Sequence, residues 1–323
     1  MAITMAQALN TALHDAFEKD DRVVLFGEDV GTLGGVFRIT DKLQERFGAD
    51  RCFDTPLAES GIVGTAVGMA MYGYRPVVEM QFDGFTYPAF EQIVSHVAKM
   101  RNRSRGTVTL PITIRIPYGG GIGAVEHHSE SPEAYFAHTA GLKVVTPGTP
   151  SDGYSLLLES IFSDDPVIFF EPKRRYWLKE DATLPTATEP IGRAVVRKEG
   201  TTATLAAYGP MVKTCMETAQ AAEAEGWDLE VVDIRSLTPF DHETIVRSVE
   251  KTGRLVVVHE AAVKLGFGAE VAARIQQHAF YYLEAPVQRV GGFDIPYPAA
   301  MLEEYFLPDV DRILDAVATT LEY

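Results

Sequence analysis

Short apolar runs alternate along the first half of the chain with segments in which apolar residues recur every three or four positions. The runs are rich in Val, Ile and Phe, as expected for strands buried on both faces of a parallel sheet. The other segments have the spacing of amphipathic helices. The predicted strands cover residues 22–29, 74–82, 110–117, 142–147 and 165–172, and the predicted helices cover residues 4–20, 87–104 and 151–162. This alternation predicts an α/β fold of βα units around a mainly parallel sheet.

The pattern is interrupted at residues 173–189, which read KRRYWLKEDATLPTATE and have no sustained periodicity. A charged, proline-containing stretch of this kind is typical of a linker between domains. We therefore predict a first domain over residues 1–180 and a smaller second α/β domain over residues 190–323. In the second domain the predicted strands cover 202–209, 229–237, 254–261 and part of PVQRVGGFDIPYPAA, and the predicted helices lie near 211–225, 241–252, 268–280 and in DVDRILDAVATTLEY.

Composition and charge narrow the class of protein. The 323 residues exceed what one ordinary hydrophobic core serves, which agrees with two domains. The formal net charge of -16 argues against nucleic acid, whose phosphates attract basic surfaces. No stretch reaches the ~18 apolar residues of a membrane helix, and the start lacks a basic leader. Cys52 and Cys215 are too far apart to suggest a disulfide framework, so we expect a cytoplasmic protein.

The common nucleotide and hydrolase motifs are absent from the sequence. There is no GxxxxGK(S/T) phosphate loop, and neither GGGIGAVEH nor GFGAEV completes the GxGxxG pattern after a strand. The GxSxG nucleophile motif and the HExxH zinc motif are missing as well. NAD, ATP, α/β-hydrolase and zinc-protease functions therefore have no motif in their favour.

Acidic residues at predicted strand ends are candidates for chemistry, because open parallel sheets bind ligands at the carboxyl ends of their strands. Glu28 and Asp29 lie at the end of the first predicted strand, in FGEDVG, where a turn or capping role is the alternative. Glu59 precedes an almost wholly apolar run whose glycines suit close helix packing at a subunit or domain contact. Packing explains the glycines but not the acid, since a carboxylate against apolar neighbours needs a partner or a proton.

A glycine-rich loop follows the predicted strand at residues 110–117 and carries His127 and His128, with His138 further on. Adjacent histidines lack the i,i+4 spacing of a helical zinc pair, so a metal site is not predicted here. Two interpretations stay open. The segment is either a polar surface loop or a mobile loop that presents a histidine for proton transfer.

Taken in order, a series of motifs resembles the beta subunit of thiamine-diphosphate-dependent 2-oxo acid dehydrogenases. The motifs are FGEDVG, GGVFRIT, FDTPLAESGIVG, EMQFDGFTYPAFEQIV, LPITIRIPYGGG, HHSESPEAYFAHTAGLKVVTP, DPVIFFEPK and KTGRLVVVHEA, and the resemblance extends over about residues 3–323. HSESPEAYFAH and FFEPK look more like the branched-chain (2-oxoisovalerate) type than the pyruvate or acetoin types, which are the alternatives. The resemblance implies a transketolase-like pyrimidine-binding domain followed by a transketolase C-terminal-like domain.

The resemblance also implies residues for a thiamine diphosphate site. The glutamate matching Glu59 hydrogen-bonds a ring nitrogen of the cofactor's aminopyrimidine and exchanges a proton there, and the aromatic residue matching Phe85 packs on that ring. The histidine matching His128 orients the 2-oxo acid and takes part in the reaction with the lipoyl group. The glutamate matching Glu28 belongs to an acidic network between two active sites, although Pro88 stands where some relatives have an acid.

A monovalent cation, commonly K⁺, is a further implication. The matching positions are Ile112, Ser160, Ile161, Ser163 and Asp165, with Ser163 in place of an aspartate of relatives. Relatives hold these cations largely with backbone carbonyl oxygens.

The thiamine diphosphate site is incomplete in this chain, because such sites hold the diphosphate and Mg²⁺ with a GDG motif that the sequence lacks. In the family an alpha subunit supplies that half, in an α2β2 heterotetramer. The implied reaction is oxidative decarboxylation of a 2-oxo acid with transfer of the acyl group to lipoyl groups of an acyltransferase that docks on the second domain. A noncatalytic scaffold on the same fold is the alternative from another class, and it would be expected to lack Glu59 or His128.

Overall fold

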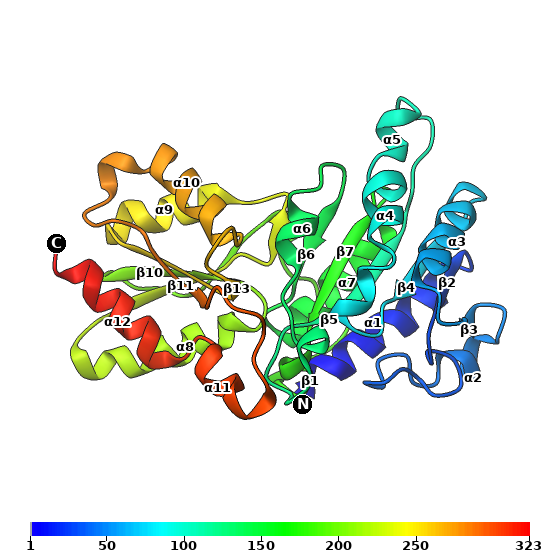
Figure 1. The fold of residues 1–323 in the computed structure, drawn as a ribbon, viewed down its shortest axis with the longest axis horizontal. Helices are drawn as coiled ribbons and strands as arrows, with labels where there is room; N and C mark the ends of the chain where they lie inside the picture. The colour runs from blue at the N-terminus through cyan, green and yellow to red at the C-terminus, as the bar shows by residue number, and fades with distance from the viewer. Residues whose placement is uncertain (1) are drawn as a thin grey trace.

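The computed structural model describes residues 2–323 and has two main sheets that stand side by side (Figure 1). Seven strands form the first sheet, in the order β12-β6-β7-β5-β4-β2-β3. Neighbouring strands are parallel except at one edge, where β12 runs antiparallel to β6. The strands are β2 (Val23–Gly27), β3 (Cys52–Asp54), β4 (Arg75–Glu79), β5 (Thr113–Tyr118), β6 (Lys143–Val145), β7 (Val167–Pro172) and β12 (Ser236–Thr238).

Helices cover both faces of the first sheet, because successive strand residues point to opposite sides. On one face α1 (Met5–Lys19) and α7 (Pro150–Phe162) pack against the side of β2 that presents Val23 and Leu25. On the other face α3 (Glu59–Met71) packs against the side that presents Val24 and Phe26. Shorter helices complete this half: α2 (Leu43–Phe47), α4 (Phe90–Gln92), α5 (Met100–Arg103) and α6 (Glu133–Ala137).

The second sheet has five strands in the order β14-β13-β10-β11-β9. Only β9, at the edge, runs antiparallel to its neighbour. Its core lies mainly between β10, β11, β13 and the helices α8 and α12, while α9 and α10 cover the other face. The elements are β9 (Val195–Lys198), β10 (Ala203–Ala207), β11 (Leu229–Asp233), β13 (Leu255–Ala262), β14 (Gln288–Gly292), α8 (Met211–Ala222), α9 (His242–Thr252), α10 (Gly268–His278), α11 (Glu303–Phe306) and α12 (Val310–Leu321).

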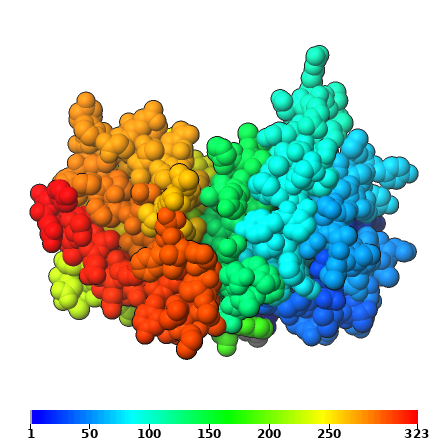
Figure 2. Space-filling model, in the orientation of Figure 1, coloured from blue at the N-terminus to red at the C-terminus, as the bar shows by residue number. Residues whose placement is uncertain are grey.

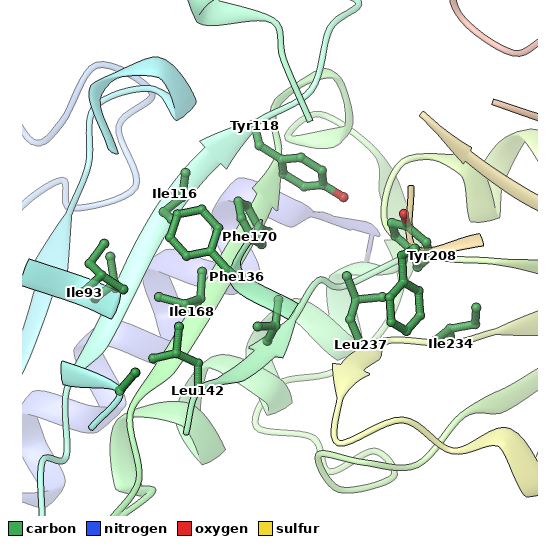
Figure 3. Close-up of a cluster of buried hydrophobic side chains, with 14 of the residues drawn as sticks. Ile93, Ile116, Tyr118, Phe136, Leu142, Ile168, Phe170, Tyr208, Ile234 and Leu237 are labelled. Carbon is green, nitrogen blue, oxygen red and sulfur yellow. The ribbon is translucent and has the colours of Figure 1, made fainter. Parts of the chain in front are cut away.

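A single hydrophobic cluster runs through both halves and joins them. It includes Ile116 and Phe170 from the first sheet and Tyr208 and Ile234 from the second half of the chain (Figure 3). The orange C-terminal segment lies directly against the green middle of the chain in the space-filling view (Figure 2). The two halves therefore meet through packed side chains rather than through a flexible tether alone.

The predicted α/β class is confirmed, and so are the strands read from apolar runs. Residues 22–29 and 74–82 contain β2 and β4, and residues 110–117 contain all of β5 except its last residue, Tyr118. The first helix begins at a capping box in which Thr4 and Gln7 satisfy each other's backbone N–H groups. Of the helices in residues 2–323, none combines the length and apolar character needed to cross a membrane.

Two element predictions are wrong in detail. The predicted helix over residues 87–104 is broken into α4, a π-helical segment at Ile93–Val97 and α5, with the Ala98 N–H bonded to the Ile93 carbonyl. The predicted strand over 229–237 splits into β11 and β12, because Arg235 adopts a left-handed φ of 57° and sends the chain to the other sheet. The wider helical turn and the left-handed bend leave no mark in an apolar pattern.

The predicted linker at residues 173–189 has more structure than expected. Its first residue, Lys173, is buried, and β8 (Lys179–Asp181) pairs antiparallel with β1 (Ala2–Thr4). The prediction took the charged residues of this stretch to face solvent. Lys173 and Arg174 instead form buried ion pairs, with Asp83 and Glu260 respectively. The limits of 1–180 and 190–323 for the two domains stay a prediction.

Candidate active site

Glu59 is the first residue of α3, and its side chain is half-buried. No side chain caps this helix end, whose N-cap is Ala58, so the first N–H groups and the helix dipole favour an anion there. A cavity of about 240 Å³ lies at the start of α3, lined by Phe26, Phe53, Thr55, Pro56, Ala58, Gly61, Ile62 and Thr65. Glu59, which the sequence analysis singles out because it precedes an apolar run, therefore lies next to a mostly apolar recess.

Glu28 follows β2 and is only 4% exposed. One of its carboxylate oxygens, Oε1, has no hydrogen-bond partner within residues 2–323. Burial, and then the charges of Glu59 and Asp29, raise the pKa of Glu28 to about 7. The structure thus brings the predicted pair Glu28 and Glu59 into electrostatic contact, and it gives Glu28 a proton to share near neutral pH.

His128 lies in an aromatic cluster at the same sheet edge. Its ring stacks on Phe82 with centroids 3.9 Å apart and an interplanar angle of 14°. Phe85 meets the His128 ring edge-on at 5.1 Å. The phenylalanines belong to the loop after β4, and His128 ends the short helix Glu126–His128. The two segments named for the cofactor and the substrate are therefore in contact, and the His128 side chain remains half-buried rather than fully exposed.

A buried ion pair fixes the backbone around His128. Lys173 Nζ donates to Asp83 Oδ1 at 2.5 Å and to the His128 carbonyl at 2.5 Å. The other oxygen of Asp83 accepts from the Glu130 N–H at 3.0 Å. Burial, opposed by Lys173, raises the pKa of Asp83 to about 6, and burial lowers the pKa of Lys173. This pair forms a clamp on the His128 carbonyl and on the Glu130 N–H two residues further on.

Another buried charge cluster lies between the strands of the same sheet. Arg115 on β5 is fully buried and donates to Glu79 Oε2 at 2.6 Å. It also donates through two nitrogens to Glu171, at 2.7 and 3.0 Å. The Tyr176 hydroxyl donates a hydrogen bond to Glu171 Oε2 at 2.7 Å. Glu171 and Glu79 together hold the pKa of Arg115 above its ordinary value against the effect of burial.

Sequence reasoning missed both of these buried clusters. The sequence analysis places Lys173 in the linker and Asp83 only within a family motif. A usable signal was present, because Asp83 and Lys173 each follow a run of apolar strand residues closely. Charged residues at the carboxyl ends of neighbouring parallel strands lie at one edge of a sheet, so they are natural partners.

The residues predicted for a cation lie around the end of α7. The carbonyl oxygens of Ile161 and Ser163 both accept from Arg75 Nη1, at 3.3 and 3.2 Å. Ser163 Oγ accepts from Lys143 Nζ at 3.0 Å, and Asp165 pairs with Arg101. Ser160 and Ile112 are buried, and the Ile112 carbonyl accepts from the Val167 N–H at 2.9 Å. The turn thus aims carbonyl oxygens at positively charged groups, and K⁺ binding there stays a prediction.

Two family descriptions match the chain. The pyrimidine binding domain of transketolase matches residues 1–177, and the C-terminal domain of transketolase matches residues 192–313. The relative named 3-methyl-2-oxobutanoate dehydrogenase subunit beta, from Mycobacterium tuberculosis, is 56% identical over 99% of this chain and 92% of its own length. Pyruvate dehydrogenase E1 component subunit beta of Leifsonia xyli subsp. xyli is 55% identical, over 100% of this chain and 96% of its own.

A third relative, 2-oxoisovalerate dehydrogenase subunit beta of Pseudomonas aeruginosa, is 47% identical over 99% of this chain and 95% of its own. Among solved structures, one described as a split gene transketolase, inactive beta4 tetramer, superposes with a TM-score of 0.82 at 26% identity. The match covers 99% of this chain and 98% of that one. The likeness therefore extends over both halves of the molecule.

Proposed function

The chain belongs to the family of 2-oxo acid dehydrogenase beta subunits built on the transketolase fold, and from that premise we propose that it supplies the pyrimidine-binding half of a thiamine diphosphate site. The observation that carries the proposal lies at the carboxyl edge of the first sheet, where the neighbouring parallel strands β2 and β4 end. The charge of Glu59 acts on Glu28 after β2, and Phe85 meets the His128 ring in the loop after β4. The charged groups that act on Glu28 are the acids Glu59 and Asp29, and an apolar recess opens next to Glu59. Such an edge suits a flat heteroaromatic ring with basic nitrogens.

We assign the roles as follows. When bound, thiamine diphosphate supplies the carbon nucleophile and the electron sink for decarboxylation of a 2-oxo acid. Glu59 holds a proton at a ring nitrogen of the aminopyrimidine and exchanges it. Phe85 packs on the ring, and Glu28 provides a second proton-sharing carboxyl, consistent with its raised pKa. His128 orients the 2-oxo acid from its stacked position on Phe82.

The partners in this proposal follow from what the half-site needs. An alpha subunit in an α2β2 heterotetramer holds the diphosphate and Mg²⁺, since the sequence has no GDG motif. A lipoyl-bearing acyltransferase accepts the acyl group. Two buried, free cysteines, Cys52 and Cys215, agree with the reducing cytoplasm. K⁺ at the α7 turn is included on the convergence of the Ile161 and Ser163 carbonyls alone.

The substrate we propose is a branched-chain 2-oxo acid, represented by 2-oxoisovalerate. The M. tuberculosis and P. aeruginosa relatives carry branched-chain names, but the L. xyli pyruvate dehydrogenase subunit is nearly as similar, so overall identity does not discriminate. The basis for preferring the branched acid is local, in the segments HSESPEAYFAH and FFEPK. Pyruvate is the alternative substrate.

The direct test is co-expression with the alpha subunit of the same organism, followed by decarboxylation assays with thiamine diphosphate and Mg²⁺. Because each carbon group in an apolar pocket is worth about 10- to 200-fold, we expect kcat/KM for 2-oxoisovalerate to exceed that for pyruvate at least ~10-fold. The reverse preference would keep the reaction and overturn the substrate. Inactivity on every 2-oxo acid would favour the noncatalytic scaffold.

Calorimetry separates the half-site claim from the substrate. The chain by itself should bind thiamine diphosphate weakly, because it lacks the GDG motif that holds the diphosphate and Mg²⁺. The assembled tetramer should bind it tightly. Tight binding without the alpha subunit would contradict the shared site.

A further inference from the structure

The glycine-rich loop after β5 is held by carboxylates from the far half of the chain. The N–H of Gly121 donates to Glu303 Oε1 at 2.7 Å, and the N–H of Gly123 donates to Glu303 Oε2 at 3.0 Å. The N–H of Gly120 donates to Glu260 Oε1. Glu260 lies on β13 and Glu303 begins α11, so both acids come from the second half of the chain. Three backbone donors of one short loop thus bind two side chains of the other domain.

Both carboxylates, Glu260 and Glu303, are buried and held by side chains around them. Glu303 is 6% exposed, and the Tyr297 hydroxyl donates to its Oε1 at 2.7 Å. Glu260 is 3% exposed and pairs with Arg174 Nη2 at 3.2 Å. A buried carboxylate that accepts several hydrogen bonds is stable only while its donors stay in position. The contacts therefore fix the loop relative to the second domain.

The glycines are required by this close approach. A side chain at Gly120 would collide with the Tyr297 hydroxyl, and Gly121 has a left-handed φ of 84°, where an added side chain would also meet Arg174. Contact between the domains therefore explains the glycine at position 120, and a left-handed backbone explains the one at position 121.

The same loop leads directly to His128. Its base is closed by the Gly119 N–H, which donates to the Glu130 carbonyl at 2.9 Å. The first half of the chain holds the His128 end through Lys173 and Asp83. The second half holds the glycine end through Glu303. His128 therefore lies in a loop with one tether in each domain.

We propose that Glu303 is a positioning residue through which the second domain sets the place of His128 at the active site. It acts through the backbone of Gly121 and Gly123 and does not touch the reacting groups. The proposal rests on the role of His128 in the proposed function. It assigns a part in substrate binding to the domain that carries none of the acid–base residues.

The test uses Glu303→Ala and Glu303→Gln in the full chain assembled with its alpha subunit. Glu304→Gln is the matched control, since Glu304 is the exposed neighbour on the same helix. Amide hydrogen exchange over residues 119–131 should be at least ~10-fold faster in Glu303→Ala, because two charge-assisted bonds are lost. Glu303→Gln keeps one acceptor and should fall between, while Glu304→Gln should match the wild type.

Steady-state kinetics give the second readout. We expect kcat/KM for the 2-oxo acid to fall about 10-fold in Glu303→Ala, chiefly through a higher KM, with Glu304→Gln unchanged. If Glu303→Ala does not assemble, Tyr297→Phe removes only the hydroxyl that supports Glu303 and should give a smaller change of the same kind.

Unchanged exchange in the loop would overturn the tether, and faster exchange with wild-type KM and kcat would overturn the positioning role. An inactive wild-type tetramer would instead overturn the proposed function. In that case the exchange rates would still decide whether Glu303 holds the loop.

Discussion

Two groups of buried acids lie on the same seven-stranded sheet and are treated differently. Around Arg115, the carboxylates of Glu79 and Glu171 are both paired with the guanidinium, and Tyr176 donates to Glu171. At the end of β2, Glu28 is as buried as Glu79, yet one of its oxygens has no partner within residues 2–323. The charged group that most affects Glu28 is another acid, Glu59.

We infer from this difference that the Arg115 cluster stabilises the sheet, whereas Glu28 and Glu59 serve a ligand. At Arg115 both carboxylates are paired with the same guanidinium, and these ion pairs join β4, β5 and β7. In the pair Glu28 and Glu59, the buried Oε1 of Glu28 has no hydrogen-bond partner within residues 2–323. A buried polar atom without a partner destabilises the fold, unless a bound ligand supplies the missing hydrogen bond. The aminopyrimidine proposed above has ring nitrogens suited to that place.

The largest expected effect comes from breaking the paired cluster at Arg115. Arg115→Met leaves Glu79 and Glu171 buried without a cation, so we expect the free energy of unfolding to fall by about 5 kcal/mol, measured by urea denaturation. Lys213→Met, which removes one member of an exposed pair on α8, should leave stability unchanged. A loss at Arg115 no larger than at Lys213 would contradict the structural role of the cluster.

A smaller effect is expected at the clamp beside His128. Lys173→Met leaves one buried carboxylate, Asp83, which can take up a proton because its pKa is already raised to about 6. We expect a stability loss of about 3 kcal/mol, together with lower kcat/KM because His128 loses its backbone anchor. The exposed Lys179 serves as control through Lys179→Met. Loss of stability with unaltered kinetics would mean that the clamp has no part in placing His128.

The strand predictions succeeded because buried parallel strands carry continuous apolar runs that can be read directly from the sequence. The acids Glu28 and Glu59 were also identifiable, since charges beside apolar runs are conspicuous. The tethers of the His128 loop could not be identified from the sequence. Asp83 and Lys173 are 90 positions apart, and Gly121 and Glu303 are 182 apart, so only the tertiary fold reveals them as partners. The break of 229–237 into β11 and β12 was hidden because the left-handed residue is an arginine and not a glycine.

The smallest effect distinguishes the unpaired acid from the paired ones by pH. The pKa of Glu28 is raised from its ordinary 4.5 to about 7, so the folded state binds more protons than the unfolded state between these values. The stability that the protonated group contributes is complete below pH 4.5 and is lost as the pH rises through 7. The slope is at most ~1.4 kcal/mol per pH unit.

Glu28→Gln should remove this component from a series of urea denaturations between pH 5 and pH 8. The exposed Glu45 on α2 provides the control through Glu45→Gln, which should keep the wild-type slope. An unaltered slope in Glu28→Gln would show that Glu28 ionises at its ordinary pKa and would remove the contrast with the Arg115 cluster.

The central claim is that the unpaired acids serve a ligand and not the fold, and Glu59→Gln in the assembled tetramer tests it most directly. Turnover of the 2-oxo acid and the free energy of unfolding should be measured on the same preparation, beside Glu91→Gln at an exposed acid. The account predicts a loss of turnover of at least ~100-fold with unchanged stability and assembly, while Glu91→Gln keeps full activity. Wild-type turnover in Glu59→Gln would contradict the account.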